Sequence, residues 1–263
     1  MGALLSDRAV LKIQGSDARD FLQGLITNDI RKLTADAPLY TALLTPQGKI
    51  LCDFLLYEHD GAVLLECERA SLGDLKTRLS RYRLRAKVEI VSRDDLAIAW
   101  EPHGNGPEAK QDPRHPALGY RTIVPADTNS ASNTAYLTHR LELGIPEGAD
   151  FGSDRMFALD ADLDELHGVA FDKGCYVGQE LTARMKHRGT ARKRLLPVES
   201  EFELPGADTP VTAPGNEIGV ITSTYANRGF AAIRLDRLAD ADGAALHAAG
   251  VHVRVRKPEW LLS

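Results

Sequence analysis

The sequence predicts an α+β protein that ends in a small C-terminal β-barrel, and three observations support this class. Helical and strand patterns alternate through roughly the first hundred residues, and tight-turn signals separate neighbouring strands there. Beyond about Leu195 the pattern changes to short strands spaced by turns that carry glycine and proline. The chain of 263 residues suffices for one large domain or for two to three small ones. We therefore expect an α+β region over residues 1–190, in one or two subdomains, and a β-barrel over residues 191–263.

Local signals predict each element of the first half of the chain. Strands are expected in the segments RAVLKIQG, LYTALLT, ILCDFLLYEH, GAVLLECE, RAKVEIV and DLAIAW, and the turn PQGK joins the second of these to the third. Ser16 or Asp17 is suited to cap a helix over SDARDFLQGLITNDI, whose apolar residues recur at helical spacing. The segment ASLGDLKTRLSRY has leucines at positions 72, 75 and 79, which predicts an amphipathic helix.

The second half begins with a polar segment and ends in strands. Residues 102–116 are rich in proline, glycine and polar groups and predict a loop, which we expect to extend to about residue 130. Helices are expected over TAYLTHRLELGI, which Gly144 and Pro146 end, and over ELTARMKH. The segments RLLPVES, NEIGVITSTY, GFAAIRLD and HVRVRKPEW predict the barrel strands, and RLADADGAALHAAG predicts a helix between them.

Composition and charge narrow the classes of function. The net charge is -5, so the molecule as a whole is not a general binder of polyanions, and we expect no direct nucleic-acid partner. No apolar run approaches the ~20 residues that span a bilayer, and the N-terminal segment lacks the pattern of a secretory leader. We therefore expect a cytoplasmic protein without a membrane partner. A GxSxG elbow, a Walker loop and a GxGxxG turn after a strand are absent, which leaves hydrolase and nucleotide-driven functions without support.

The spacing of cysteines and histidines does not indicate a permanent metal site. Cys52, Cys67 and Cys175 are far apart in the sequence, without the paired spacing of a disulfide framework, a zinc site or a cluster site. The 8 histidines form no HxH or HxxxH pair. We therefore expect no permanently bound metal.

The segment FDKGCYVGQELTARMKHRG, residues 171–189, contains the cysteine with the most informative surroundings. In an extended segment Lys173 and Cys175 project to the same side, and an ammonium there favours the reactive thiolate. Gly174 and Gly178 permit unusual backbone angles or a close approach to a ligand. Alternatively, Cys175 is a small buried apolar residue beside a turn. The residues alone leave both alternatives open.

Asp53 is the most unusual carboxylate, because it lies within the apolar segment ILCDFLLY. Such a group faces solvent at a strand edge, pairs with another group or lines a cavity. Tyr40 and the Asn28–Asp29 pair are similarly ambiguous, since an Asn-Asp after a helix is usually a cap or a turn. Basic residues gather in RYRLRAK and RMKHRGTARKR, which indicates either a solvated surface or the recognition of an anion.

The segment KGCYVGQE, Lys173–Glu180, resembles the signature of the YgfZ-type folate-binding proteins. That family includes mitochondrial iron–sulfur cluster assembly factors and is related to the aminomethyltransferase (T-protein) of the glycine cleavage system. The segments FLQGLITNDI, PQGKILCDFLLY, RLELGIP and NEIGVITSTY are similar to further segments of that transferase family, so the resemblance covers the chain except for roughly residues 102–130. It implies an aminomethyltransferase-like (GcvT-like) fold that holds tetrahydrofolate in a central cavity.

The resemblance also implies the residues of the site. The cofactor-binding residues would be Asp53, Tyr40, Asn28, Arg140 and Glu142, of which the last two are the weaker matches. Cys52 replaces the first of the transferase's paired aspartates. Lys173 and Cys175 would be the functional pair, and the motif would be shaped by Gly174, Tyr176, Gly178, Gln179 and Glu180.

The function that the resemblance implies is tetrahydrofolate-dependent help in the assembly or repair of iron–sulfur clusters, by an accessory factor more than by an enzyme. Client enzymes would include those that thiolate tRNA. Cys175 would ligate the iron of a cluster transiently or accept sulfur, and iron–sulfur assembly proteins or cluster-containing clients would supply the other ligands. Arg81, Arg83 and Arg85 would hold the anionic glutamate tail of the folate. Three alternatives stay open, namely a folate-dependent aminomethyl transferase, an RNA-binding module that uses residues 184–194, and a structural scaffold.

Overall fold

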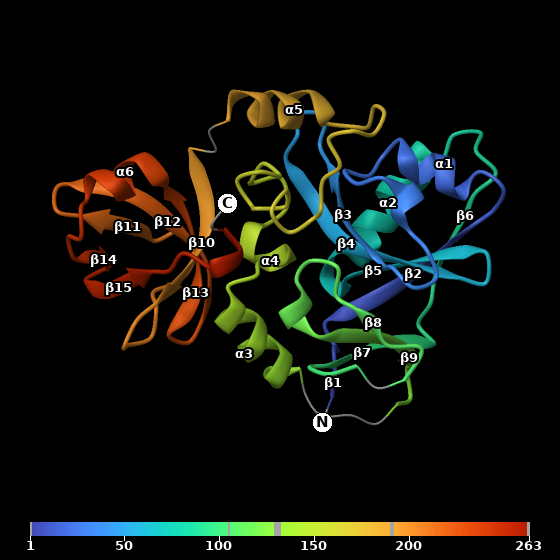
Figure 1. Ribbon diagram of the computed structural model, residues 1–263, viewed down its shortest axis with the longest axis horizontal. Helices are drawn as coiled ribbons and strands as arrows, with labels where there is room; N and C mark the ends of the chain where they lie inside the picture. The colour runs from blue at the N-terminus through green and yellow to red at the C-terminus, as the bar shows by residue number, and fades with distance from the viewer. Residues whose placement is uncertain (1, 105, 129–132, 190–191, 262–263) are drawn as a thin grey trace.

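The computed structural model describes residues 2–104, 106–128, 133–189 and 192–261. Figure 1 shows two sheets on one side of the molecule and a closed barrel on the other, with short helices between them. The predicted α+β class, with a mixed helix and sheet N-terminal part and a C-terminal β-barrel, is confirmed. The loop predicted over about 102–130 and the barrel predicted from residue 191 include positions 105, 129–130, 191 and 262–263, which lie outside the described residues.

A five-stranded antiparallel sheet is the centre of the N-terminal part. Its strands lie in the order β3 (Leu39–Leu44), β4 (Ile50–His59), β5 (Ala62–Glu68), β2 (Arg8–Gln14) and β6 (Glu89–Ser92). Helices α1 (Ala18–Gln23) and α2 (Leu72–Tyr82) cover one face, where Leu22 and Leu75 pack with Phe54 of the sheet. The other face is buried as well, which explains why β3 is buried along its whole length.

A second sheet packs beside the first. Its strands lie in the order β1 (Ala3–Leu4), β7 (Leu96–Glu101), β9 (Tyr120–Pro125) and β8 (Lys110–Gln111), and α3 (Thr134–Leu143) lies against β1. Apolar side chains of both sheets, of α3 and of the barrel form one central core, which includes Leu55, Trp100, Leu141 and Phe230. The centre of the molecule therefore lies where the two sheets meet the barrel.

Six antiparallel strands close the C-terminal barrel. Around the barrel they follow the order β10 (Lys193–Glu199), β13 (Arg228–Arg234), β12 (Asn216–Tyr225), β11 (Pro210–Ala213), β14 (Leu246–Ala248) and β15 (Val251–Val255), and β15 pairs back with β10. The barrel has an apolar core of its own, and α6 (Leu235–Asp240) packs on its outside against β12 and β13. Closure leaves no long unpaired edge strand among the described residues of the barrel, 192–261.

Arg194 at the start of the barrel attaches it to the preceding segment. Its Nη1 atom donates to the carbonyl oxygen of Leu159 at 2.7 Å and to Oδ1 of Asp162 at 2.9 Å. The backbone N–H of Leu195 donates to the carbonyl oxygen of Asp160 at 2.8 Å. The barrel is therefore joined to the N-terminal part by hydrogen bonds at the start of its first strand.

Two predicted helices are shorter in the structure than the sequence suggests. The helix expected over residues 16–30 ends at Gln23, and Ile26 pairs instead with Leu43 in an isolated β-bridge. The helix expected over residues 237–250 ends at Asp240, because the backbone turns at Gly243 and then forms the strand β14, which the sequence did not predict. None of the described helices is long and apolar enough to cross a bilayer.

The segment predicted as a loop over residues 102–116 is partly ordered and partly buried. It contains the short strand β8 and leads into a 3-10 helix, Pro116–Leu118. Asp112 and Arg114 are only 2% and 1% exposed. The remaining helices are α4 (Gly148–Phe151), α5 (Gln179–Arg188) and 3-10 turns at Ile30–Lys32, Arg69–Ser71 and Glu259–Leu261.

Candidate functional site

Asp53 lies at the buried centre of the molecule. Successive side chains of β4 point to opposite faces, so Cys52 and Phe54 pack beneath α1 and α2 while Asp53 and Leu55 face the second sheet. Because both faces of the five-stranded sheet are covered, Asp53 is only 1% exposed. The alternative that placed this carboxylate at a solvent-exposed strand edge is therefore wrong.

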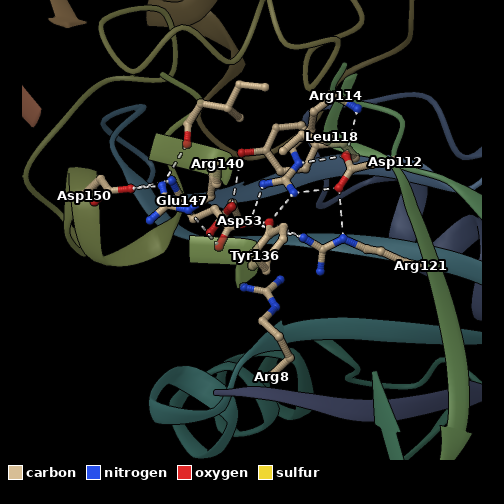
Figure 2. Close-up of polar contacts among 12 residues, drawn as sticks. Arg8, Asp53, Asp112, Arg114, Leu118, Arg121, Tyr136, Arg140, Glu147 and Asp150 are labelled. Atoms are coloured by element: carbon tan, nitrogen blue, oxygen red, sulfur yellow. Dashed lines mark hydrogen bonds and ion pairs between the residues drawn. The ribbon is translucent and has the colours of Figure 1, made fainter. Parts of the chain in front are cut away.

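A buried network of charged side chains from distant segments adjoins Asp53 (Figure 2). Its members are Arg8, Glu66, Asp112, Arg114, Arg121, Tyr136, Arg140, Glu147 and Asp150. Each of these residues is at most 9% exposed. With Asp53 included, five carboxylates face four arginines, so negative charge is in slight excess at this centre.

Arg114 and Arg121 share the carboxylate of Asp112. Nη2 of Arg114 and Nε of Arg121 lie 2.7 Å and 2.9 Å from the same oxygen, Oδ2. Nη1 of Arg114 also lies 2.7 Å from Oε1 of Glu147, and Arg121 forms an ion pair with Glu66. Arg121 also lies 3.2 Å from Oε1 of Glu147, so each arginine joins at least two carboxylates, the multiple partners that a buried charge requires.

Tyr136 and Arg140 extend the network toward the barrel. The hydroxyl of Tyr136 donates to Oε1 of Glu147. Nη1 of Arg140 lies 2.5 Å from Oδ2 of Asp150, and the other oxygen of Asp150 accepts a hydrogen bond of 2.6 Å from the hydroxyl of Ser223 in β12. The network thus connects both sheets, α3 and the barrel.

Charge pairing determines the pKa of the buried carboxyl groups. Burial alone raises the pKa of Asp112, but Arg114 and Arg121 outweigh this effect and lower it to about 2. The surrounding arginines likewise outweigh burial at Glu147 and hold its pKa well below the ordinary value. At Asp53 the balance is reversed, because burial raises the pKa and the nearby arginines offset only part of the effect.

One oxygen of Asp53 is unsatisfied. Oδ2 accepts a hydrogen bond of 3.1 Å from the hydroxyl of Tyr40, whereas Oδ1 is buried and has no hydrogen-bond partner among the described residues. Oδ1 lies next to Gly148, because a Cβ built on that glycine would lie 3.3 Å from Oδ1 and 2.8 Å from Oε2 of Glu68. Gly148 and Glu68 line a cavity of about 200 Å³, whose other lining residues include Asp7, Arg8, Tyr136, Arg140, Glu147 and Tyr225.

The structure brings three of the predicted cofactor-binding residues to this centre. Tyr40 contacts Asp53 directly, and Arg140 lines the cavity. Asn28 is buried but serves the backbone instead, since its amide donates to the carbonyl oxygens of Tyr40 at 2.8 Å and of His167 at 2.7 Å. Its amide group therefore ties β3 to the segment around His167, and both of these hydrogen bonds are made to the backbone.

Glu142 lies outside the cavity, and the structure contradicts its predicted place there. Its side chain is 54% exposed and forms an ion pair of 3.2 Å with Arg228. In α3 it follows Arg140 by two residues, which places the two side chains on different faces of the helix. The predicted basic rim is also elsewhere, because Arg81 lies in the last turn of α2, Arg83 and Arg85 follow that helix, and none of them lines the cavity.

Sequence reasoning missed most of the network. Arg8 is a charged residue at the start of the apolar strand β2, and Glu66 is a charged residue inside the apolar strand β5. A charge in an apolar strand is also the pattern that singles out Asp53. Asp112 and Arg114 lie in the segment predicted as a loop, where polar residues are expected and carry no information.

Cys175 is exposed on the loop that precedes α5, whereas Cys52 and Cys67 are buried. Burial raises the pKa of the Cys67 thiol to about 12 and that of the Cys52 thiol well above its ordinary value. The alternative in which Cys175 is a buried apolar residue is therefore excluded, and the thiol that the fold presents to solvent is the one in the motif.

Lys173 fixes this loop to the end of α1. Its Nζ atom donates to the carbonyl oxygens of Gln23 at 2.7 Å, Ile26 at 2.7 Å and Asn28 at 2.9 Å. An ammonium has three protons, so these bonds leave none for the thiol of Cys175. Burial lowers the pKa of Lys173 to about 8. Activation of the thiol by Lys173 stays a prediction, and the contacts indicate a positioning role.

The remaining motif residues shape the turn into α5. Gly178 has φ of +83°, and a Cβ built on it would lie 2.5 Å from the carbonyl oxygen of Thr45. The side chain of Gln179 accepts a hydrogen bond of 3.3 Å from the backbone N–H of Tyr176. Glu180 is exposed and forms an ion pair within α5. A glycine is thus required where the loop crosses the turn between β3 and β4.

The family model described as "CAF17, C-terminal beta-barrel domain" matches residues 192–263. The chain is 32% identical to the human mitochondrial iron–sulfur cluster assembly factor IBA57 over 276 residues, which covers 89% of this chain and 77% of that protein. It is 35% identical over 240 residues to the Mycosarcoma maydis homologue of that factor, and the match covers 80% of this chain but only 59% of the longer relative.

A likeness to a solved structure identifies the fold. The crystal structure of the glycine cleavage system aminomethyltransferase T from Bartonella henselae matches with a TM-score of 0.76 over 98% of this chain and 85% of that one. The sequence identity is 14%, so this likeness concerns the fold alone. The expected aminomethyltransferase-like fold is therefore confirmed.

Two expectations change in the light of these relatives. The expected cytoplasmic location is contradicted, because the curated relatives matched over most of the chain are named as mitochondrial proteins. The expected link to tRNA thiolation finds no support in their names. They carry the IBA57 name, and the YgfZ-type assignment stays a prediction.

Replacing Gly178 by alanine should destabilise the protein by about 1–3 kcal/mol, because the side chain would meet the backbone of Thr45 in a left-handed conformation. Gly174→Ala is a matched control in the same loop, where a built Cβ meets nothing within 4 Å. It should change the free energy of unfolding by less than ~0.5 kcal/mol. Urea denaturation followed by circular dichroism measures both, and equal losses would contradict the close packing at Gly178.

Arg114→Met should cost about 3–5 kcal/mol of stability, because it leaves Asp112 and Glu147 without one of their buried partners. Arg78→Met, which removes an exposed ion pair with Asp74 on α2, should cost less than ~0.5 kcal/mol. Thermal and urea unfolding of the two variants provide the comparison. Similar small losses for both would show that the central network does not depend on Arg114.

Proposed function

This chain belongs to the family of IBA57-type iron–sulfur cluster assembly factors, and we propose that it binds tetrahydrofolate and uses Cys175 to help assemble or repair iron–sulfur clusters in client enzymes. The observation that carries the proposal is the exposed thiol of Cys175 on a loop that is anchored at both of its ends. The cluster is the cargo of this reaction, and folate is the resident cofactor.

The anchoring of the loop favours a bond to a partner outside the chain. Lys173 holds the residues before Cys175 through three backbone carbonyl oxygens, and Gly178 packs the residues after it against Thr45. The thiol therefore keeps a fixed position without a partner from its own loop. A cysteine so held can meet an approaching cluster with little loss of conformational entropy.

The chemistry of the thiol requires a second protein. Cys175 binds iron as a thiolate, so forming an iron–sulfur bond releases its proton to solvent. A cluster needs four protein ligands, and no group of three or more His, Cys, Asp or Glu side chains in the described parts of the chain is arranged to hold a metal. The remaining ligands therefore belong to an iron–sulfur carrier or to the client enzyme, which makes the attachment transient.

The central cavity fits the head group of a folate. Tetrahydrofolate has a bicyclic pterin whose N–H edge requires acceptors, and Oδ1 of Asp53 is a buried acceptor without a partner. A cavity of about 200 Å³ is large enough for such a ring system but smaller than the ~300–1,000 Å³ that encloses a whole drug-sized ligand. We place the pterin beside Asp53 and Gly148 and the glutamate tail outside the cavity.

The chain's own residues would bind and orient this head group. Asp53 would accept hydrogen bonds from the pterin N–H edge, while Tyr40 fixes the carboxylate through Oδ2. Glu68, which also lies next to Gly148, offers a second carboxylate at the cavity wall. When bound, tetrahydrofolate supplies a redox-active ring that accepts one-carbon units.

The alternative of an aminomethyl transferase rests on the fold alone. The transferase likeness is at 14% identity, and here Cys52 stands where the transferase family has the first of two aspartates. Cys52 faces the apolar core beneath α1 and α2, away from the cavity. No contact in the centre of the molecule favours aminomethyl transfer over the accessory role.

Cys175→Ser should abolish the support of cluster-containing enzymes in cells that depend on this protein, because serine removes the thiolate and keeps the size of the side chain. Cys52→Ala, which removes a buried thiol, should retain that support. The activities of cluster enzymes in complemented deletion cells are the measurement. In the purified protein, iodoacetamide should modify Cys175 alone, as mass spectrometry can verify. Full activity of Cys175→Ser would refute the role of the thiol and leave folate binding untouched.

Asp53→Asn should weaken tetrahydrofolate binding by about 10–100-fold, the equivalent of one hydrogen bond to a charged group. The same change should leave stability at pH 8 equal or higher. Folding raises the pKa of Asp53, so the wild-type protein loses free energy of unfolding as the pH rises from about 4 through the folded pKa. Asparagine does not ionise, so the variant avoids that loss.

Anaerobic calorimetric titration with tetrahydrofolate measures the affinity, and urea unfolding measures the stability. Glu142→Gln is the matched control, because this exposed carboxylate lies outside the cavity, and its affinity for folate should equal that of the wild type. Unchanged affinity in Asp53→Asn would remove folate from the proposed function and leave the role of Cys175 standing.

A further inference from the structure

We propose that His247 and His252 form a two-ligand site for a divalent transition-metal ion on the outer surface of the C-terminal barrel. The two side chains lie on neighbouring strands, and both are exposed. The proposal goes beyond the function given above, which uses neither residue. Sequence spacing could not reveal the pair, because four residues separate the two histidines and only the hairpin brings them together.

The geometry of the hairpin brings the two imidazoles close. The turn between β14 and β15 consists of residues 249–250, whose φ angles of +48° and +83° are those of a type I′ turn. A two-residue turn of this kind is closed by a hydrogen-bonded pair, here Ala248 and Val251. The next pair, His247 and His252, is then non-hydrogen-bonded, the position in which opposite side chains approach most closely.

The two rings are already near the separation that a shared ion requires. Their centroids are 5.7 Å apart, and their planes meet at 72°. Two imidazoles that bind one tetrahedral ion at about 2.0–2.1 Å have their ring centres about 5 Å apart. A small rotation of the exposed side chains therefore suffices. Neither ring takes part in a hydrogen bond with the residues that the structure describes.

The surroundings hold the pair in place without competing for it. The hydroxyl of Thr212 in β11 donates to the carbonyl oxygen of His247 at 3.2 Å, which fixes β14 in the barrel. Arg254 is the next residue on the face of β15 that carries His252, and its charge is paired with Glu199 at 3.4 Å. The strands on either side thus keep the two imidazoles opposite each other.

The chemistry of the donors determines which ions are suited. Imidazole is a ligand for zinc, copper and nickel, and affinity for such sites rises along the series to copper. Since the described part of the chain groups no three metal-ligating side chains, the two histidines would be the only protein ligands and water would fill the other positions. Such a site is open and exchangeable, unlike a closed structural zinc site.

Titration of the protein with Zn²⁺ and with Cu²⁺ tests the proposal. Cys175→Ser provides the background, because the exposed thiol would otherwise bind both ions. Isothermal calorimetry should find one Zn²⁺ per chain at the proposed site. The electron paramagnetic resonance spectrum with one equivalent of Cu²⁺ should show hyperfine coupling to two imidazole nitrogens.

Single replacements of the two histidines decide the outcome. In that background His247→Thr and His252→Thr should each weaken Zn²⁺ binding by about tenfold or more, since each removes half of the protein ligands. Threonine suits an exposed strand position, and circular dichroism verifies that the barrel is intact. His103→Thr, at another exposed histidine, should bind like the background. Absence of binding, or equal binding by all four proteins, would overturn the proposal.

Discussion

A charge can remain buried only where opposite charges and hydrogen bonds replace the water it has lost, and this constraint organises the centre of the molecule. Arg114 joins Asp112, beside the second sheet, to Glu147 before α4, while Arg121 links the second sheet to Glu66 in the first. Separating the sheets would break the buried ion pair between Arg121 and Glu66. The network therefore fixes walls of the cavity, and Asp53 keeps an acceptor oxygen without a described partner next to Gly148 in the cavity lining.

The sequence was most informative where a residue type conflicts with its local pattern. The α+β class and the barrel follow from alternation and turn signals, and Asp53 was found because a carboxylate in an apolar strand must have a reason to be there. Arg8 and Glu66 carry the same signal and were overlooked. The burial of Asp112 and Arg114 could not be predicted, because it depends on tertiary contacts between distant segments, which no local sequence pattern specifies.

In the motif around Cys175, too, some features can be predicted from the local sequence and others depend on tertiary contacts. A functional thiol could be proposed from its glycine-flanked setting, and the structure shows that Cys175 is exposed. The hydrogen-bond partners of Lys173 could not be anticipated, because its three acceptor carbonyl oxygens belong to a segment about 150 residues earlier in the chain. The pairing of His247 with His252 was hidden for a related reason, since it depends on the register of a hairpin whose first strand lies in a segment predicted as helix.

The order of the network residues along the chain has a consequence for folding during synthesis. Glu66 can meet Arg8 as soon as β5 is made, but its second arginine, Arg121, follows 55 residues later. At about 5–20 residues per second, a ribosome needs about 3–11 s to add that stretch. For most of this interval Arg8 is the only arginine of the network that has been synthesised, and it pairs with Glu66. The inner face of the nascent first sheet should therefore stay hydrated. Water can be excluded from the centre of the protein only after the second sheet has been synthesised.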